Sequence, residues 1–270
     1  MSASMAQSAS SVDDDLLYEV REGIGQITFN RPRARNALTF AMYERMAQIA
    51  RGVKDDPSIR VLIITGAGEK AFASGTDISQ FRAFETPRDA IDYEDRIESV
   101  LGDLETCPVP VVAAIAGACT GGGAAIAGCC DIRIGTADSR FGFPIARTLG
   151  NCLSMSNIGR LVALIGPARV KDLIMTARLV GAEEAKAIGL LNEVVPDAEA
   201  LRARAWDLAR AMSGHAPLTM RAAKEAVRRL TPRIPAEEGQ DLILSCYMSQ
   251  DFREGMDAFL AKRKPQWKGV

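Results

Sequence analysis

Two spacings of hydrophobic residues alternate along the first half of the chain, and they predict strands alternating with helices. Residues 16–20 and 25–30 predict paired strands around a turn at Glu22-Gly23. Helical spacing of apolar positions predicts helices at 39–53, 89–104 and 123–130. Short β-branched runs predict buried strands at 60–65, 109–116 and 132–135.

The pattern changes after Phe141, where helical spacing dominates and only residues 193–195 predict a strand. The helices expected there are 156–165, 168–176, 182–188, 199–212, 217–230, 236–249 and 251–262. Strands alternating with helices are typical of an α/β fold. We therefore expect a disordered tail over 1–14, an α/β core over 15–200 and a helical C-terminal region over 201–270.

Composition and charge exclude some partners. The chain has 270 residues, of which 47% are hydrophobic, and its 33 basic and 34 acidic residues are interspersed. No basic face suggests nucleic acid, so a small-molecule substrate is the default expectation. Six cysteines show no CxxC spacing, and Cys129 and Cys130 are adjacent, which fits neither a disulfide framework nor a metal site. Reduced thiols in the cytoplasm are expected.

An uncharged stretch over residues 107–130 raises a membrane-spanning helix as an alternative. Pro108 and Pro110 interrupt its start, three glycines break its middle, and most of the rest is alanine. This composition argues against a membrane span. The first 15 residues carry no basic segment followed by an apolar run, so they do not resemble a secretory signal.

Two glycine-rich turns share one design, in which a buried strand leads into small residues and then into a helix. One turn lies in residues 72–78 and the other in residues 120–123. Helix N-termini leave backbone N–H groups unpaired, and two such donors on one carbonyl oxygen form an oxyanion hole. The glycines alternatively serve only a tight turn. A dinucleotide-binding fingerprint fits badly, because Ile126 stands where glycine or alanine is required.

Together, these segments resemble the crotonase superfamily, also called the enoyl-CoA hydratase/isomerase family, from about Leu17 to Lys268. Its motifs occur here in the family's order. They are Asn30-Arg31-Pro32 with Asn36-Ala37-Leu38, the segment 69–78, the segment 110–123 with 130–134, and the segment 251–255 with Phe259 and 262–265. Each motif alone is weak, but the ordered set is specific.

The resemblance implies a spiral of ββα turns with a helical C-terminal region, assembled as a trimer or a dimer of trimers. It places the oxyanion amides at Thr76 and Gly122. Its acyl-CoA-binding residues correspond here to Ala71 and Ala73, whose main chain holds the adenine, together with Ser74, Gly75, Asp77, Ile78 and Lys262. Lys262 would meet the CoA phosphates, or is a solvated helix end. No cofactor beyond the CoA of the substrate is implied.

The sequence departs from the family at two positions. Hydratases of the family resemble one another in a glutamate soon after the glycine turn and another after an FGxP segment, but Ala125 and Ile145 stand there. With one extra residue in the alignment, Ala146 takes the second position. None of these side chains can transfer a proton. The only histidine, His215, is expected at the surface before a C-terminal helix.

Two segments offer replacement groups. Arg147, Thr148, Asn151 and Cys152 follow the vacated second position, although they alternatively bond the loop backbone. The run Asp92-Tyr93-Glu94-Asp95 lies on a helix that borders the acyl pocket in the family, although such a run is commonly a solvated face. Asp77 is expected to cap a helix.

The function expected from these observations is an acyl-CoA enzyme that stabilises a thioester enolate without the usual glutamates. A lyase, a hydratase and a decarboxylase all belong to this class. The alternative is a catalytically lapsed acyl-CoA-binding protein, which the loss of both glutamates would also produce.

Overall fold

The computed structural model describes residues 12–230, 234–235 and 237–270. The chain begins with a hairpin of β1 (Leu16–Arg21) and β2 (Ile24–Phe29), which pair antiparallel as predicted. Glu22 and Gly23 both have positive φ, at 54° and 73°. This is the backbone of a type I′ turn, whose twist matches that of a two-stranded ribbon.

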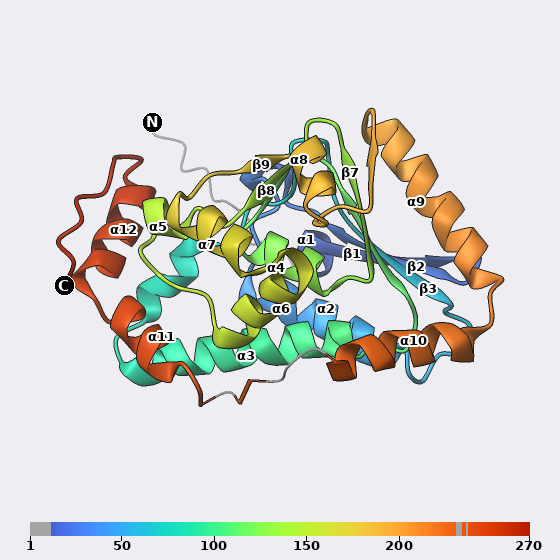
Figure 1. Ribbon diagram of the computed structural model, residues 1–270, viewed down its shortest axis with the longest axis horizontal. Helices are drawn as coiled ribbons and strands as arrows, with labels where there is room; N and C mark the ends of the chain where they lie inside the picture. Colours follow the sequence, from blue (N-terminus) through green and yellow to red (C-terminus); the bar gives the residue numbers. More distant parts are fainter. Residues whose placement is uncertain (1–11, 231–233, 236) are drawn as a thin grey trace, which may run out of the picture.

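The larger sheet has six strands in the order β1-β2-β3-β5-β7-β10, and all neighbours except β1 and β2 are parallel (Figure 1). The added strands are β3 (Val61–Gly66), β5 (Val111–Ile115), β7 (Ile132–Thr136) and β10 (Glu193–Val195). Successive residues of β3 face opposite sides: Leu62 and Ile64 pack in the core that contains α2 (Phe40–Gly52), and Val61 and Ile63 pack against α9 (Ala198–Ser213).

A second sheet of four short strands, in the order β4-β6-β8-β9, was not predicted. Its members are β4 (Ala71–Ala73), β6 (Ala118–Thr120), β8 (Arg140–Gly142) and β9 (Val180–Gly181). The chain gives β3 to the first sheet, β4 to the second and then forms a helix, and it repeats this order with β5, β6 and the next helix. This is the predicted crotonase-like spiral of ββα turns, and it confirms the α/β class.

The remaining helices surround this spiral, and those after Ser213 form the C-terminal region. They are α1 (Val12–Asp15), η1 (Pro32–Ala34), η2 (Ile78–Ala83), α3 (Pro87–Glu105), α4 (Gly122–Cys129), α5 (Ile145–Thr148), α6 (Met155–Ile165), α7 (Pro167–Met175), α8 (Ala182–Ala187), α10 (Pro217–Leu230), α11 (Gln240–Tyr247) and α12 (Gln250–Leu260). Each predicted helix is present, with its ends shifted by a few residues.

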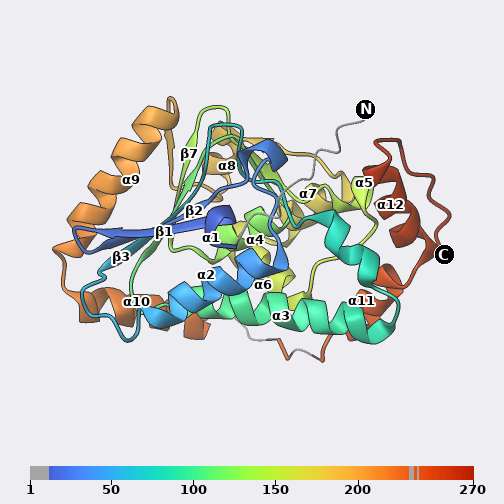
Figure 2. The same cartoon turned by 180° about the vertical axis from the view of Figure 1, so that it is seen from behind.

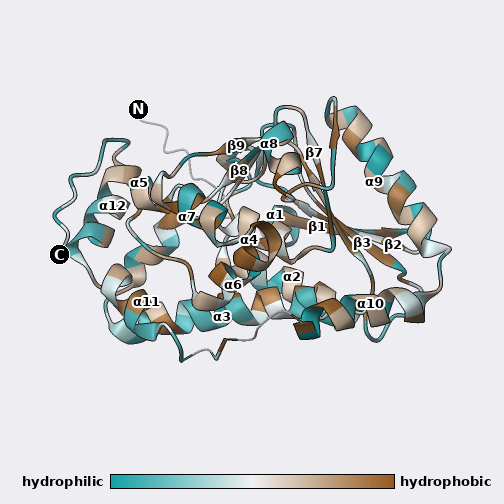
Figure 3. Ribbon diagram, viewed as in Figure 1, coloured by the Kyte–Doolittle hydropathy of each residue, from teal (hydrophilic) through white to brown (hydrophobic). Residues whose placement is uncertain are grey.

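Helix α4 lies in the middle of the molecule and is apolar along its length (Figure 3). Gly123, Ala124, Ile126, Ala127 and Cys129 of this helix are buried. No helix of the described residues is long and apolar enough to cross a membrane. The uncharged stretch instead forms β5, β6 and α4 inside the fold.

Two helices lie across the boundaries that the sequence predicts for the tail and the C-terminal region. Residues 12–14, expected in the tail, belong to α1, where the Asp14 carbonyl accepts a hydrogen bond from Asn30 Nδ2 (2.8 Å). Helix α9, expected in the C-terminal region, covers the large sheet, and Leu201 and Ala205 are buried against it. The core therefore extends to Ser213. The rest of the expected tail, and residue 236 at the predicted start of α11, lie outside the described residues.

We predict that Asn36→Ala destabilises the fold by about 2–4 kcal/mol. Asn36 is fully buried at positive φ, its Nδ2 donates to the carbonyls of Ala67 (3.0 Å) and Ala71 (2.7 Å), and its Oδ1 accepts from Arg31 N (3.0 Å). Urea unfolding measures the change. Gln48→Ala, at an exposed site of α2, is the control and should change stability by less than about 0.5 kcal/mol. Equal midpoints for the two variants would contradict this account.

Candidate active site

The pairing of β4 with β6 brings the two glycine-rich turns together. These strands run parallel, and Ala73 is the register partner of Cys119. Thr76 and Gly122 are each the third residue after this pair, so they leave the same edge of the sheet side by side. Ligand sites in α/β proteins commonly lie at this carboxyl edge. We had expected the turns to follow β3 and β5 directly, but a short strand of the second sheet precedes each one.

Gly75 and Gly121 make the contact between the turns. Their φ angles are +106° and +53°, conformations that residues with side chains rarely adopt. A Cβ added to Gly121 would lie 3.3 Å from the Gly75 Cα, and one added to Gly75 would lie 3.7 Å from the Thr120 carbonyl oxygen. The two turns therefore approach each other closely enough that a side chain at Gly121 would contact Gly75, and the Thr76 and Gly122 amides lie on the residues that follow.

Both amides are available to a ligand. Thr76 bridges to Leu38, but the bonds of this bridge use the Gly75 carbonyl and the Asp77 amide (2.9 and 2.8 Å). Gly122 is the first residue of α4, where an amide has no acceptor within the helix. Across the part of the chain that the structure describes, neither amide donates a hydrogen bond to protein. Gly122 also lies at the positive end of the α4 dipole.

Two tyrosines hold the Thr76 side chain beside Gly122. The Thr76 Oγ1 lies 2.9 Å from Tyr43 Oη and 3.2 Å from Tyr93 Oη. A Cβ at position 122 would come within 1.9 Å of Tyr43 Oη and 3.2 Å of Thr76 Oγ1. Burial raises the pKa of both tyrosines, so they remain neutral hydrogen-bonding groups. Only glycine fits at position 122 without displacing this network.

The residues implied for CoA binding lie on β4 and the turn after it. Ala71 and Ala73 are buried, and the Ser74 amide donates to the Arg35 carbonyl (3.1 Å). Asp77 caps η2 as predicted, because its carboxylate accepts from Ser79 N (3.2 Å) and pairs with Arg31 (3.0 Å). Burial alone would raise the pKa of Asp77, but these hydrogen bonds lower it below its usual value. Ile78, which follows, is buried.

Ala125 and Ile145 lie close in the fold to the paired turns. Ala125 is one helical turn after Gly122 and packs against the main core. Strand β8 pairs with β6 through Thr120 and Gly142, and Ile145 begins α5 three residues later. Ile145 is buried, whereas Ala146 is exposed. The carboxyl ends of β4, β6 and β8 thus bring positions 76, 122 and 145 to one edge of the sheet.

The structure gives the other predicted residues different surroundings. Arg147 is exposed on α5, and Lys262 is exposed after α12 and forms no ion pair with any described residue. The partly buried Cys152 is a free thiol that forms hydrogen bonds with the Cys246 thiol and with the Leu242 carbonyl oxygen (3.5 Å). The first of these bonds raises the pKa of Cys152, so it stays a neutral thiol. His215 is exposed before α10, as predicted.

The run on α3 instead contributes a partly buried acidic group. Glu94 is partly buried and accepts a hydrogen bond from Tyr247 Oη (2.6 Å), which in turn accepts one from Asn151 Nδ2 (3.1 Å). Burial raises the pKa of Glu94 from 4.5 to about 7, against the opposing effect of the Tyr247 hydrogen bond. Asp92 and Asp95 of the same run are exposed, as a solvated face would be.

The sequence carried a signal that distinguishes Glu94 from its neighbours. Ala90, Ile97 and Leu101 are buried on one face of α3, and Glu94 falls on this face, four residues after Ala90 and three before Ile97. A carboxylate on the apolar stripe of a helix is uncommon and points to a functional site. The prediction from the sequence alone takes the four residues as one run, whatever their helical phase.

Aromatic rings connect Glu94 and Thr76 to the C-terminal helices. Tyr247 of α11 packs with Phe81 of η2 and Tyr93 of α3, and Phe252 of α12 packs with Phe81, at centroid separations of 6.0 to 6.3 Å. The members of this aromatic cluster are Phe40, Phe81, Phe84, Tyr93, Tyr247 and Phe252. Figure 2 shows α11 and α12 at the end of α3 that carries these residues. The C-terminal region therefore covers its own chain's candidate site.

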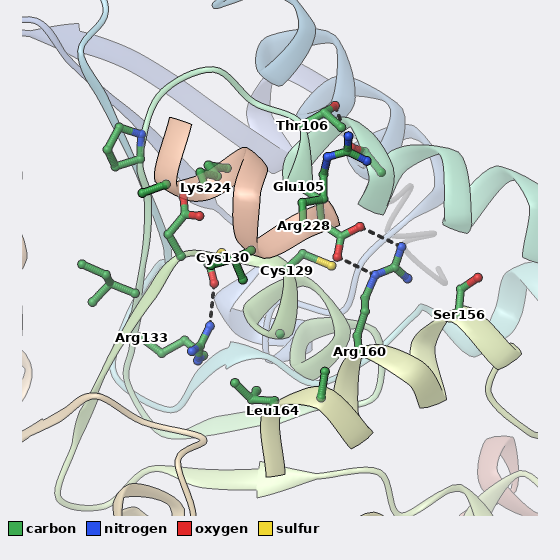
Figure 4. Close-up of a pocket in the computed structure, with 18 of the residues that line it drawn as sticks. Glu105, Thr106, Cys129, Cys130, Arg133, Ser156, Arg160, Leu164, Lys224 and Arg228 are labelled. Carbon is green, nitrogen blue, oxygen red and sulfur yellow. Dashed lines mark hydrogen bonds and ion pairs between the residues drawn. The ribbon is translucent and has the colours of Figure 1, made fainter. Parts of the chain in front are cut away.

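A cavity that the structure also contains lies away from the two turns. Its volume is about 810 Å³, and it is bordered by the C-terminal parts of α3 and α4 and by α6 and α10 (Figure 4). The basic groups of its lining already have partners. Arg160 pairs with Glu98 and Glu105, Lys224 with Asp131 (2.6 Å) and Arg228 with Glu225, and Arg133 donates to backbone carbonyls. Its lining residues on α4 are at the opposite end from Gly122, about 10 Å along the helix. We therefore centre the candidate site on the paired turns.

Comparisons with known proteins agree with this architecture. The family model described as enoyl-CoA hydratase/isomerase matches residues 19–270. A short-chain-enoyl-CoA hydratase of Clostridium acetobutylicum is 33% identical over 261 residues, covering 93% of this chain and 96% of that protein. A carnitinyl-CoA dehydratase of Escherichia coli O157:H7 is 37% identical over 262 residues, covering 94% and 98%.

A solved structure of a methylmalonyl-CoA decarboxylase in complex with 2-nitronate-propionyl-CoA is also similar, with a TM-score of 0.85 at 30% identity. The match covers 94% of this chain and 98% of that one. The fold and the ordered motifs define a crotonase-like protein. The chain belongs to the enoyl-CoA hydratase/isomerase family, and it is an enzyme of that family.

We predict that Glu94→Gln stabilises the fold relative to the wild type as the pH rises from about 4.5 to about 7. In this window the folded wild type keeps the Glu94 proton while the unfolded chain releases it, so the wild type's free energy of unfolding falls as the pH rises. The glutamine side chain does not titrate, so this decrease in the free energy of unfolding is absent from the variant. Urea unfolding at about pH 5 and about pH 8 measures the difference.

Asp92→Asn is the control for this measurement, because Asp92 is an exposed carboxylate two residues away on the same helix. Its effect on stability should stay nearly constant between the two pH values. If Glu94→Gln changed stability equally at both, Glu94 would have an ordinary pKa and the account of its burial would be wrong.

Proposed function

We propose that this enzyme binds an acyl-CoA thioester and stabilises its enolate with the backbone amides of Thr76 and Gly122. The observation that carries the proposal is the register of β4 and β6, which brings side by side two amides that have no acceptor among the described residues. Two donors fixed on one oxygen stabilise negative charge as it develops, and each is worth about 3–4 kcal/mol. The dipole of α4 adds to this effect at Gly122.

The reaction we propose is loss of CO₂ from a malonyl-type thioester. Breaking the bond between the α-carbon and the carboxylate leaves its electron pair on the thioester as an enolate, so no base is needed to start the reaction. Ala125 and Ile145 cannot act as bases. Hydration, by contrast, needs a proton acceptor near the water. The likeness to a methylmalonyl-CoA decarboxylase supports this choice.

The CoA portion would lie along β4 and the turn that follows it. The resemblance to the family assigns the adenine to the main chain of Ala71 and Ala73 and the phosphates to Lys262. Lys262 supports this assignment because its side chain is exposed, and α12, which ends just before it, packs against η2. The proposed chemistry requires no cofactor and no metal beyond the CoA of the substrate.

We also propose that the protein assembles as a trimer or a dimer of trimers in the cytoplasm. Helix α10 supports assembly, because Ala223, Val227 and Leu230 form an exposed apolar stripe beside the large cavity. Leu230 is 83% exposed. A second copy covering this stripe would remove it from water. All six cysteines are free thiols, which supports a reducing compartment.

We predict that Gly122→Ala lowers kcat for decarboxylation of methylmalonyl-CoA by about 100- to 1000-fold. The added methyl would collide with Tyr43 Oη and with the Thr76 side chain. The collision would move the Gly122 amide away from the Thr76 amide. Gly128→Ala is the matched control, because it adds the same methyl to the same helix where no atom lies within 4 Å. It should retain activity. Mass spectrometry of the acyl-CoA product measures both rates.

Two results would contradict the proposal. Equal kcat for Gly122→Ala and Gly128→Ala would show that the two turns do not carry the reaction. Tight binding of acyl-CoA esters, with no turnover of malonyl-type or enoyl thioesters by the wild type, would instead favour a lapsed acyl-CoA-binding protein.

For the assembly, we predict that Leu230→Asp dissociates the oligomer, because a charge on the apolar stripe would be buried against the second copy. Light scattering coupled to size-exclusion chromatography measures the mass. Met175→Asp is the control, because Met175 is 75% exposed on α7, away from this stripe. A wild-type monomer, or equal masses for the two variants, would contradict the proposed interface.

A further inference from the structure

The proposed decarboxylation leaves one step without a residue. When CO₂ departs, the enolate must take a proton on its α-carbon to become the acyl-CoA product. The amides of Thr76 and Gly122 hold the oxygen and do not supply this proton. Asp77 is occupied as a helix cap, and the thiol of Cys152 is held by its partner Cys246.

A chain of hydrogen bonds joins Glu94, Tyr247 and Asn151. Stabilisation of the enolate by the two amides does not involve these residues. The Asn151 amide donates to Tyr247 Oη (3.1 Å), and Tyr247 Oη donates to the Glu94 carboxylate (2.6 Å). These groups come from three separate elements: α3, α11 and the loop after α5. Only the tertiary fold brings them together, and the C-terminal region supplies the central member.

These hydrogen-bonded residues lie beside the turn that carries Thr76. Tyr93 precedes Glu94 on α3, and its hydroxyl is 3.2 Å from Thr76 Oγ1. The rings of Tyr93 and Tyr247 are neighbours, with centroids 6.2 Å apart. One aromatic side chain therefore separates Thr76 from Tyr247.

Asn151 is incompletely bonded. Its Oδ1 is buried and accepts no hydrogen bond from any described residue, which is costly for an amide oxygen away from water. When the Glu94 carboxyl is protonated, it can donate to Tyr247 Oη, and the tyrosine proton is then free to turn toward another acceptor. The chain accommodates both directions of donation, as a proton relay requires.

A small cavity gives Glu94 a path to water. Its volume is about 30 Å³, and Glu94, Ser154 and Ile243 are among its lining residues. This is enough for one water molecule, which needs about 10–15 Å³. A carboxylate that has given up its proton can be reprotonated there without opening the site.

We infer that Tyr247 protonates the α-carbon of the thioester enolate and that Glu94 restores the Tyr247 proton. This inference rests on the proposed function. The bond from the α-carbon to CO₂ breaks, a new C–H bond forms with the Tyr247 proton, and the Glu94 proton passes to Tyr247. Solvent then returns one proton to the Glu94 carboxylate, so the net reaction consumes the carboxylate form of the malonyl-type thioester and one proton and releases CO₂ and the acyl thioester.

The groups around Glu94 favour its protonated form near neutral pH. Asp95 and Glu98 on α3 raise its pKa by repulsion, and burial against α11 raises it more. The hydroxyls of Tyr43, Tyr93 and Tyr247 and the Cys152 thiol also face Glu94 and are neutral. The Glu238 carboxyl lines the same small cavity as Glu94. Activity should therefore fall as the pH rises through about 7, where Glu94 loses its proton.

The test compares Glu94→Gln and Tyr247→Phe with the wild type on methylmalonyl-CoA between about pH 6 and about pH 8. Both variants keep the shape of the side chain. We expect kcat to fall about 100-fold in each with KM nearly unchanged, and the wild-type loss of kcat above neutral pH to disappear in Glu94→Gln. Asp92→Asn, on the exposed face of α3, should keep the wild-type kcat and pH profile.

A second readout separates this inference from the reaction itself. Exchange of the α-hydrogens of propionyl-CoA in deuterium oxide, followed by mass spectrometry, requires the same enolate and the same proton donor. Wild-type kcat and pH profile in Glu94→Gln would overturn the inference and leave the proposed decarboxylation standing. If the wild type does not decarboxylate, slower exchange in both variants would still support the relay. Wild-type exchange rates in them, or no exchange in the wild type, would overturn it.

Discussion

The parallel pairing of two three-residue strands, β4 and β6, is the constraint on which the rest of the site depends. The register partners Ala73 and Cys119 place both turns at one edge of the small sheet, and Gly75 and Gly121 let the main chains touch there. A slip of one residue in this pairing would move one amide away from the other. Every chemical proposal for the protein begins from this alignment.

Burial decides which polar groups near this edge can react. Asp77 and Glu94 are both partly buried, but Asp77 is paired with Arg31 and bonded by Ser79, so its charge is stabilised. The charge of Glu94 has no basic partner of this kind among the causes of its pKa shift, and burial opposes it. The same α3 segment presents Asp92 to water and Glu94 to the aromatic cluster. Two carboxylates two residues apart therefore have different chemistry because of helical phase alone.

Much of the fold followed from the sequence, because β3 and β5 are continuous apolar runs and α2 carries a clear helical period. The strands of the small sheet did not, since two or three residues are too few for a period to be read. The ordered motifs predicted the positions Thr76 and Gly122. Their placement side by side depends on the pairing of β4 with β6, which the sequence does not show. The hydrogen-bond partners of Glu94 could not be predicted either, because Tyr247 and Asn151 lie 153 and 57 residues away along the chain.

The central claim is that the Thr76 and Gly122 amides polarise a thioester carbonyl. Isotope-edited infrared spectroscopy tests it most directly, with an unreactive acyl-CoA that carries carbon-13 at the thioester carbonyl. The account predicts that the carbonyl band moves to lower frequency on binding to the wild type and to Gly128→Ala, and that the shift is lost in Gly122→Ala. A bound ligand whose carbonyl band stays at its solution frequency, or shifts equally in all three proteins, would contradict it.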